Sequence, residues 1–178
     1  MSSNYSYYAI PAAWVVAMGP HFYAAGLSKS SKELPDFTNA EPREFIQRCR
    51  ALEKQTPVSR NSSNALTLST NLVADLTRQF YQVVKKYLRA EAASQNGFET
   101  MALFAVSILA GNVAKLSATT LNGFAAFYLG SRVLYNLLYI NTTKEGPANA
   151  RSVTYVAGIV SICTLFVKSS RALEALRF

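Results

Sequence analysis

The stretch that decides the fold runs from Arg89 to Ala114 and reads RAEAASQNGFETMALFAVSILAGNVA. Its first half is polar and its second half, from Met101 on, has no charged residue, yet no proline interrupts a helical pattern. Arg89, Asn96 and Glu99 recur at spacings of seven and three, so a helix places a guanidinium, an amide and a carboxylate on one face. An unpaired polar group in an apolar environment costs several kcal/mol. We therefore expect this face to meet protein partners or a polar ligand.

The composition favours a membrane protein. Half of the 178 residues are hydrophobic, only 16% are charged, and the net charge is +8. The basic residues are segregated, because residues 1–27 contain no Lys or Arg whereas residues 28–89 contain eleven of the 18. Basic segments between apolar runs are typical of juxtamembrane loops, while a nucleic-acid binder gathers its basic residues in a patch on a polar fold. We expect the lipid bilayer as a partner, and no nucleic acid.

The apolar runs predict an all-α, multi-pass integral membrane protein that forms a single domain over residues 1–178. Four spans are expected, at about residues 7–27, 80–115, 118–140 and 152–168. By the positive-inside rule, the polar interval 28–77 is predicted to be a mostly irregular loop in the cytosol. Within this loop, the periodicity of Pro42 to Lys54 indicates an amphipathic helix suited to the membrane surface.

The third apolar run is interrupted by Asn122, Arg132 and Asn136. A charged residue well inside a span costs about 2.5 to 3.5 kcal/mol on insertion scales, so Arg132 is expected to face the protein interior. Tyr135 and Tyr139 follow Arg132 at spacings of three and seven and therefore share its face.

The two cysteines, Cys49 and Cys163, form neither a metal-ligand motif nor a disulfide framework. We interpret Cys49 as a free surface thiol and Cys163 as a small apolar residue that fills space in the last span. No metal site is expected.

Three segments resemble the MAPEG family, the membrane-associated proteins of eicosanoid and glutathione metabolism. Residues 89–99, RAEAASQNGFE, are similar to the family's second-helix motif, and Arg132 with Tyr139 is similar to its third-helix Arg and Tyr pair. Residues 151–155, RSVTY, resemble the start of its fourth helix. The resemblance implies a left-handed four-helix bundle, a homotrimer, and residence in the endoplasmic reticulum.

The resemblance also implies that glutathione is the cosubstrate and binds between neighbouring subunits near the cytosolic side. The residues that it assigns to glutathione binding are Arg89, Asn96, Glu99, Arg132, Tyr139 and Tyr155, with Glu99 pairing with the amino group. The chemistry needs a thiolate, and a thiol with a pKa near about 8.5 is mostly protonated at neutral pH. We expect Arg151 to be the main stabiliser of the thiolate and Ser152 an auxiliary donor, at the N-terminus of the fourth helix.

Two positions depart from the family pattern. Ala92 stands where some members carry an arginine, and Ser94 stands where some carry a histidine, so we expect one fewer glutathione contact and weaker affinity.

The leading prediction is a microsomal-type glutathione transferase that conjugates glutathione to a lipophilic electrophile, with glutathione peroxidase activity as a related reaction. Two alternatives stay open. One is a glutathione-dependent isomerase of a lipophilic substrate. The other is a non-catalytic membrane adaptor whose polar residues only join helices through hydrogen bonds.

Overall fold

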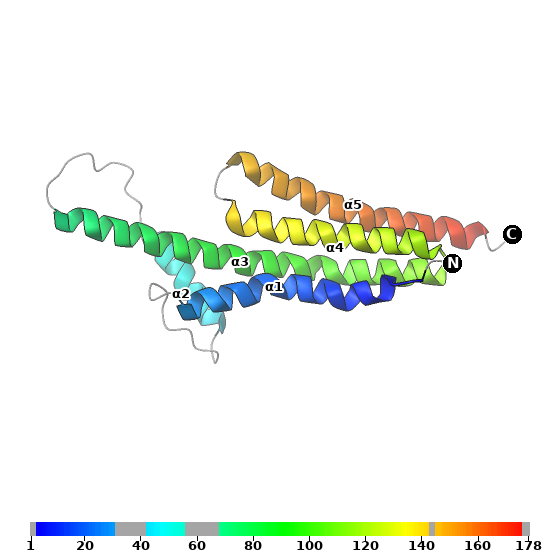
Figure 1. Ribbon diagram of the computed structural model, residues 1–178, viewed down its shortest axis with the longest axis horizontal. Coiled ribbons are helices and arrows are strands. Elements are labelled where there is room, and N and C mark those ends of the chain that lie inside the picture. The colour runs from blue at the N-terminus through cyan, green and yellow to red at the C-terminus, as the bar shows by residue number, and fades with distance from the viewer. Residues whose placement is uncertain (1–2, 31–41, 56–67, 143–144, 176–178) are drawn as a thin grey trace. The chain divides into compact units, whose positions relative to one another are not determined.

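The computed structural model describes residues 3–30, 42–55, 68–142 and 145–175. Within these ranges every element is helical, which confirms the predicted all-α class. The elements are η1 (Ser6–Tyr8), α1 (Ala9–Ser30), α2 (Pro42–Gln55), α3 (Leu68–Val113), α4 (Ala118–Asn141) and α5 (Glu145–Ala175) (Figure 1). The chain divides into two compact units, which are described separately: unit 1 comprises Met1–His21 and Ala92–Phe178, and unit 2 comprises Phe22–Glu91.

Two helices are longer than the sequence predicted. α3 begins at Leu68, well before residue 80, and α5 extends beyond residues 152–168 at both ends. Hydropathy gives no signal in these polar extensions, but no proline or glycine interrupts α3 between residues 68 and 80. In α5, Pro147 lies in the first turn, where the missing N–H costs no helical hydrogen bond. α4, by contrast, ends within one residue of its predicted boundary.

The predicted polar loop 28–77 therefore contains the end of α1, all of α2 and the start of α3. The helix predicted over Pro42 to Lys54 is observed as α2. The remainder of the loop, residues 31–41 and 56–67, lies outside the described residues.

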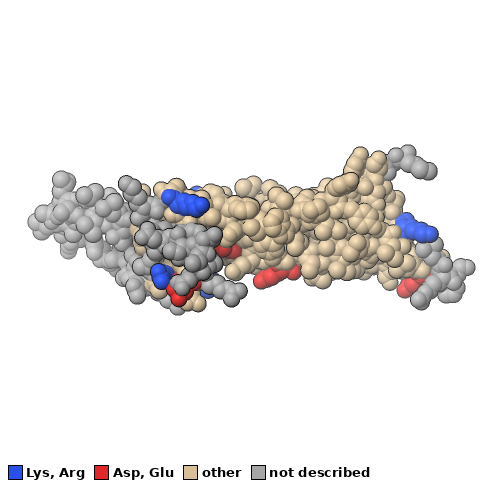
Figure 2. Space-filling view, turned by 90° about the horizontal axis from the view of Figure 1, so that it is seen from below, with Lys and Arg blue, Asp and Glu red and all other residues tan. Residues whose placement is uncertain are grey.

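One helix in the described part of the chain, Asn149–Ala175, is long and apolar enough to cross a membrane, with a mean hydropathy of 1.6. The polar residues Asn122, Arg132 and Asn136 lower the hydropathy of α4. Large apolar side chains are nevertheless exposed on all of the long helices, as is typical of a surface that meets lipid or another protein. On the face shown in Figure 2, a broad band carries no Lys or Arg. That any of the four long helices crosses the membrane stays a prediction.

Aromatic and small residues form the core of unit 1. The ring of Phe104 on α3 stacks on Tyr128 of α4, with centroids 4.0 Å apart and planes 9° apart. The hydroxyl of Thr100 lies 2.9 Å from that of Tyr128, which satisfies both buried groups. On the neighbouring surface of α3, a Cβ added to Gly97 would lie 2.9 Å from the Cβ of Ala17 on α1. Small residues at this contact let the two helix backbones approach closely.

A proline in α1 is compensated by a side chain of α4, and a side chain of α3 bonds to the neighbouring carbonyl. Pro20 has no N–H, so the carbonyl of Val16, four residues earlier, loses its helical partner. The side-chain amide of Asn136 on α4 donates to this carbonyl at 2.9 Å. The hydroxyl of Ser94 on α3 donates to the next carbonyl, that of Ala17, at 2.8 Å. Asn136 and Ser94 thus hold α1 against α3 and α4.

The N-terminal segment is held by asparagines at the opposite end of these helices. The amide of Asn122 on α4 donates to the carbonyl of Ser3 at 2.8 Å, and its oxygen accepts from the N–H of Tyr5 at 2.8 Å. On α3, the oxygen of Asn112 accepts from the amide of Asn4 at 2.7 Å. Asn122 is therefore a structural residue.

In unit 2, α2 packs apolar side chains against α3, and the prediction of a surface thiol on α2 is wrong. The ring of Phe45 meets that of Tyr87 edge-on, with centroids 5.1 Å apart. Cys49, one turn after Phe45, is completely buried, so it is not a surface thiol. The position of α2 on the membrane surface stays a prediction. In unit 1, the prediction that Cys163 fills space in the last span is also wrong, because this side chain is exposed on α5. Both cysteines are free thiols.

Replacing Asn136 with Leu should lower stability by about 1 to 2 kcal/mol, because the carbonyl of Val16 then loses its partner. The same substitution should cost less in a Pro20→Ala background, where residue 20 can again donate its N–H to Val16. The four denaturation midpoints of this double-mutant cycle, measured in detergent, give the coupling. Equal losses in both backgrounds would contradict the compensation.

Burial raises the pKa of the Cys49 thiol to about 11. Since the thiolate is the reactive form, a water-soluble alkylating reagent should modify Cys49 slowly in the folded protein from pH 7 to pH 9, and faster only as the pH nears the raised pKa. Intact-mass measurement of a Cys163→Ala variant follows Cys49 alone, and the denatured chain is the control. Equal rates in the folded and denatured chain at pH 8 would count against the burial.

Candidate functional site

Arg132 on α4 is a buried cation with incomplete pairing. Its side chain is 4% exposed, and one guanidinium nitrogen, Nη2, donates to the backbone carbonyl of Tyr155 on α5 at 3.2 Å. Within the described part of the chain, the other two nitrogens, Nε and Nη1, have no hydrogen-bond partner. The predicted inward orientation of Arg132 is therefore confirmed.

Aromatic rings surround this guanidinium. Its central carbon lies 4.8 Å from the ring centroid of Tyr155, 5.1 Å from that of Tyr128 and 5.8 Å from that of Tyr135. Cation–π contacts of this kind stabilise a desolvated guanidinium. They do not replace the two missing hydrogen bonds, and an uncompensated buried charge is destabilising.

The three polar residues that interrupt the apolar sequence of α4 thus differ in their hydrogen bonding. Asn122 and Asn136 each bond to backbone groups of the N-terminal segment or α1, and both have a structural role. Arg132 alone of the three is left with two unpaired buried donors. A fixed cation with spare donors favours an anionic ligand nearby.

Gly158 on α5 makes room for Arg132, and the sequence reasoning did not identify it. A Cβ at this position would collide with Nη2 of Arg132 and would lie 2.9 Å from the hydroxyl oxygen of Ser131. The available signal was its spacing, because Gly158 follows Tyr155 by three residues and so shares its helix face.

Next to Arg132, a pocket of about 320 Å³ opens between α3, α4 and α5 of unit 1. It is lined by Asn96, Tyr135, Tyr139, Arg151, Ser152, Tyr155 and Val156. The side-chain amide of Asn96 donates to the hydroxyl of Tyr135 at 2.7 Å. The guanidinium carbon of Arg151 lies 4.4 Å from the ring centroid of Tyr139, so stacking holds this cation at the wall.

The structure brings together most of the predicted site residues. Five line the pocket: Asn96, Tyr139, Tyr155, Arg151 and Ser152. Arg132 lies over the ring of Tyr155, one of the lining residues. Tyr135 and Val156 were not assigned to the site, although the spacing of Tyr135 from Arg132 had placed it on the same face.

Two predicted site residues are not part of this pocket. Glu99 is exposed on α3 and does not line it. Arg89 belongs to unit 2, so the structure assigns it no place relative to the pocket.

The prediction that the N-terminus of the fourth helix stabilises the thiolate is wrong. α5 begins at Glu145, so Arg151 and Ser152 lie inside the helix, beyond its first turn. The effect of the helix dipole falls off within that turn. Arg151 and Ser152 would therefore stabilise an anion through their guanidinium and hydroxyl groups alone, without help from the helix dipole.

Comparison with known proteins identifies a family. The MAPEG family model matches residues 7–170, a range that includes every residue of the pocket. No curated protein and no solved structure matches the chain.

Replacing Gly158 with Ala should displace the Arg132 guanidinium and lower the thermal midpoint by several degrees, since overpacking typically costs about 1 to 3 kcal/mol. Gly130→Ala is the matched control, because an added Cβ there meets nothing within 4 Å. Differential scanning calorimetry in detergent compares the two variants. A Gly158→Ala protein as stable as Gly130→Ala would show that the contact is unimportant.

Proposed function

Because the chain belongs to the MAPEG family, we propose that it is a membrane-bound glutathione transferase that joins the glutathione thiolate to a lipophilic electrophile. The family is membrane-associated and includes glutathione transferases. One observation carries the proposal: a buried arginine with two unpaired donors lies beside a pocket that holds a second arginine.

The chemistry of the pocket suits a peptide with carboxylates. Glutathione has two carboxylates, one amino group and one thiol. The guanidinium of Arg151 can bind a carboxylate or a thiolate, and the amide of Asn96 can bond to the peptide groups. The hydroxyls of Tyr135, Tyr139 and Tyr155 add donors and acceptors. Arg132 adds positive charge from behind the Tyr155 ring, where a low dielectric strengthens its effect.

In the proposed reaction, Arg151 and Ser152 lower the pKa of the bound thiol, so that its proton is lost to solvent at neutral pH. The thiolate then attacks an electrophilic carbon and forms a C–S bond, and the leaving group departs with its electron pair. With a lipid hydroperoxide, the same thiolate would attack the terminal oxygen and break the O–O bond, which gives glutathione sulfenic acid and a lipid alkoxide that takes a proton from solvent. A second glutathione would then displace water to form the disulfide.

Assembly would complete the site. We place glutathione between neighbouring subunits of a homotrimer, near the cytosolic face of the endoplasmic reticulum membrane, with four helices of each subunit crossing the bilayer. Glu99 is exposed on α3, so it is accessible to a neighbouring copy, where its carboxylate would pair with the amino group of glutathione. Arg89 would supply a further carboxylate contact.

One observation favours a protein that binds glutathione more weakly or has no catalytic activity. Ser94, which replaces the histidine of some family members, donates its hydroxyl to the carbonyl of Ala17 and does not line the pocket. A non-catalytic membrane adaptor is therefore the second candidate. A glutathione-dependent isomerase would use the same thiolate and regenerate it.

Glutathione binding to the detergent-purified protein, followed by calorimetry, is the primary test. Arg151→Gln should weaken binding and reduce the thiolate absorbance of bound glutathione. It should also lower the rate with a model electrophile by about 100-fold, the typical loss when one preorganised electrostatic group is removed. Arg171→Gln is the control, because Arg171 is exposed on α5 and does not line the pocket.

The outcomes separate the candidate functions. Saturable binding with a glutathione adduct in the product mass supports the transferase. A product of unchanged mass that forms only with glutathione present indicates the isomerase. Failure to bind glutathione at millimolar concentration would reject both enzymes and leave the adaptor.

A further inference from the structure

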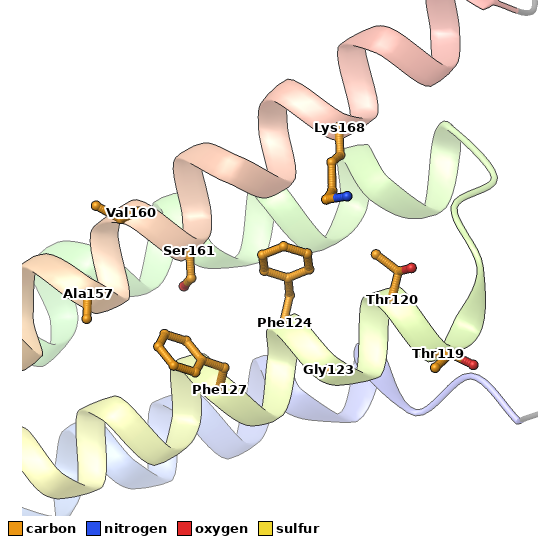
Figure 3. A pocket seen from close by; sticks show the side chains of 9 residues that line it. All are labelled: Thr119, Thr120, Gly123, Phe124, Phe127, Ala157, Val160, Ser161 and Lys168. Carbon is orange, nitrogen blue, oxygen red and sulfur yellow. The ribbon is translucent and has the colours of Figure 1, made fainter.

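A second depression lies between α4 and α5 and is apolar. Its volume is about 600 Å³, and it is lined by Thr119, Thr120, Gly123, Phe124, Phe127, Ala157, Val160, Ser161 and Lys168. It shares no residue with the polar pocket. Figure 3 shows Lys168 extending from α5 toward α4, with Phe124 and Thr120 below it. We call this depression the α4–α5 groove.

The groove has one charged end and an apolar body. Among the described residues that line the groove, Lys168 is the only charged one. Two of the hydroxyls are already engaged, because Ser161 donates to the carbonyl of Gly158 at 2.7 Å and Thr120 bonds to Ser117 at 2.8 Å. Phe124, Phe127, Ala157 and Val160 supply apolar surface. A cation at one end of an apolar groove is complementary to an amphiphile with an anionic head group.

The length and openness of the groove fit a lipid of the bilayer. From Lys168 to Ala157 along α5 the distance is about 16 Å at 1.5 Å per residue, close to half of a hydrocarbon core of about 30 Å. α5 contains the helix that is apolar enough to cross a membrane, so the groove would span about one leaflet. Phe127 and Val160 are 54% and 55% exposed, so the groove is open along its side.

We propose that the α4–α5 groove binds one anionic phospholipid. One acyl chain lies along Phe124, Phe127 and Val160, the phosphate pairs with the ammonium of Lys168, and the second chain stays in the bilayer outside the open side. A flexible lysine near the end of a span can bring its charge to the head-group level. A zwitterionic lipid binds less well, because its own cation offsets the attraction of Lys168 for the phosphate. The site is independent of glutathione binding.

The test is native mass spectrometry of the full-length protein in a nonionic detergent, titrated with phosphatidylglycerol or with phosphatidylcholine of the same chains. The protein should retain phosphatidylglycerol preferentially. Lys168→Gln should weaken this retention by up to about fivefold and abolish the preference, since one exposed ion pair contributes up to about 1 kcal/mol, which is a factor of about five. Lys115→Gln, which removes an exposed lysine outside the groove, should change nothing.

A second pair of variants tests the apolar body. Gly123→Leu should fill the groove and reduce the retention of both lipids, whereas Gly130→Leu on the same helix should not. An added Cβ meets nothing within 4 Å at either glycine, so both variants can fold. Unchanged retention in Lys168→Gln and Gly123→Leu would overturn the proposal. It would also be overturned if oleate displaced phosphatidylglycerol at equal concentration, or if Gly123→Leu altered the oligomeric state and left lipid retention intact.

Discussion

Every polar group inside an apolar helix bundle must find a partner within the protein, and this constraint governs unit 1. The carbonyl that Pro20 leaves unpaired receives the amide of Asn136, and the next carbonyl receives the hydroxyl of Ser94. Thr100 and Tyr128 pair with each other across α3 and α4. Against this background of satisfied groups, the two unpaired donors of Arg132 are an exception that points to a ligand.

The same constraint explains which parts of the fold could be predicted. Residue spacing predicted the polar face of α3, and hydropathy predicted the bounds of α4. Both features follow directly from which side chains are polar and which are apolar. The true starts of α3 and α5 lie in polar segments, where hydropathy gives no signal. No proline or glycine interrupts α3 between residues 68 and 80, and Pro147 of α5 is tolerated because it lies in the first turn. The burial of Cys49 depends on contact between α2 and α3, and the periodicity of α2 does not show which surface its apolar side meets.

Among the site residues, sequence spacing identified those that share a helix face but not the side chains that they meet. Asn96 and Glu99 were placed on one face of α3, yet only Asn96 lines the pocket and Glu99 is exposed. Gly158 was not predicted as a site residue because its role is to leave space for the side chain of Arg132. A sequence alone does not show which glycine has a large side chain packed against it. Asn122 and Asn136 interrupt α4 as Arg132 does, and only their backbone partners show that they are structural.

The bond between Asn136 and the Val16 carbonyl also restricts how this chain can change during evolution. If Asn136 is replaced first, the carbonyl freed by Pro20 is left unpaired; if Pro20 is replaced first, the amide must compete with a restored backbone N–H. Each single replacement therefore gives a protein in which the Val16 carbonyl or the Asn136 amide has poorer hydrogen bonding. Residues 20 and 136, which lie 116 positions apart in the sequence, are thus expected to be inherited as a pair and to vary together.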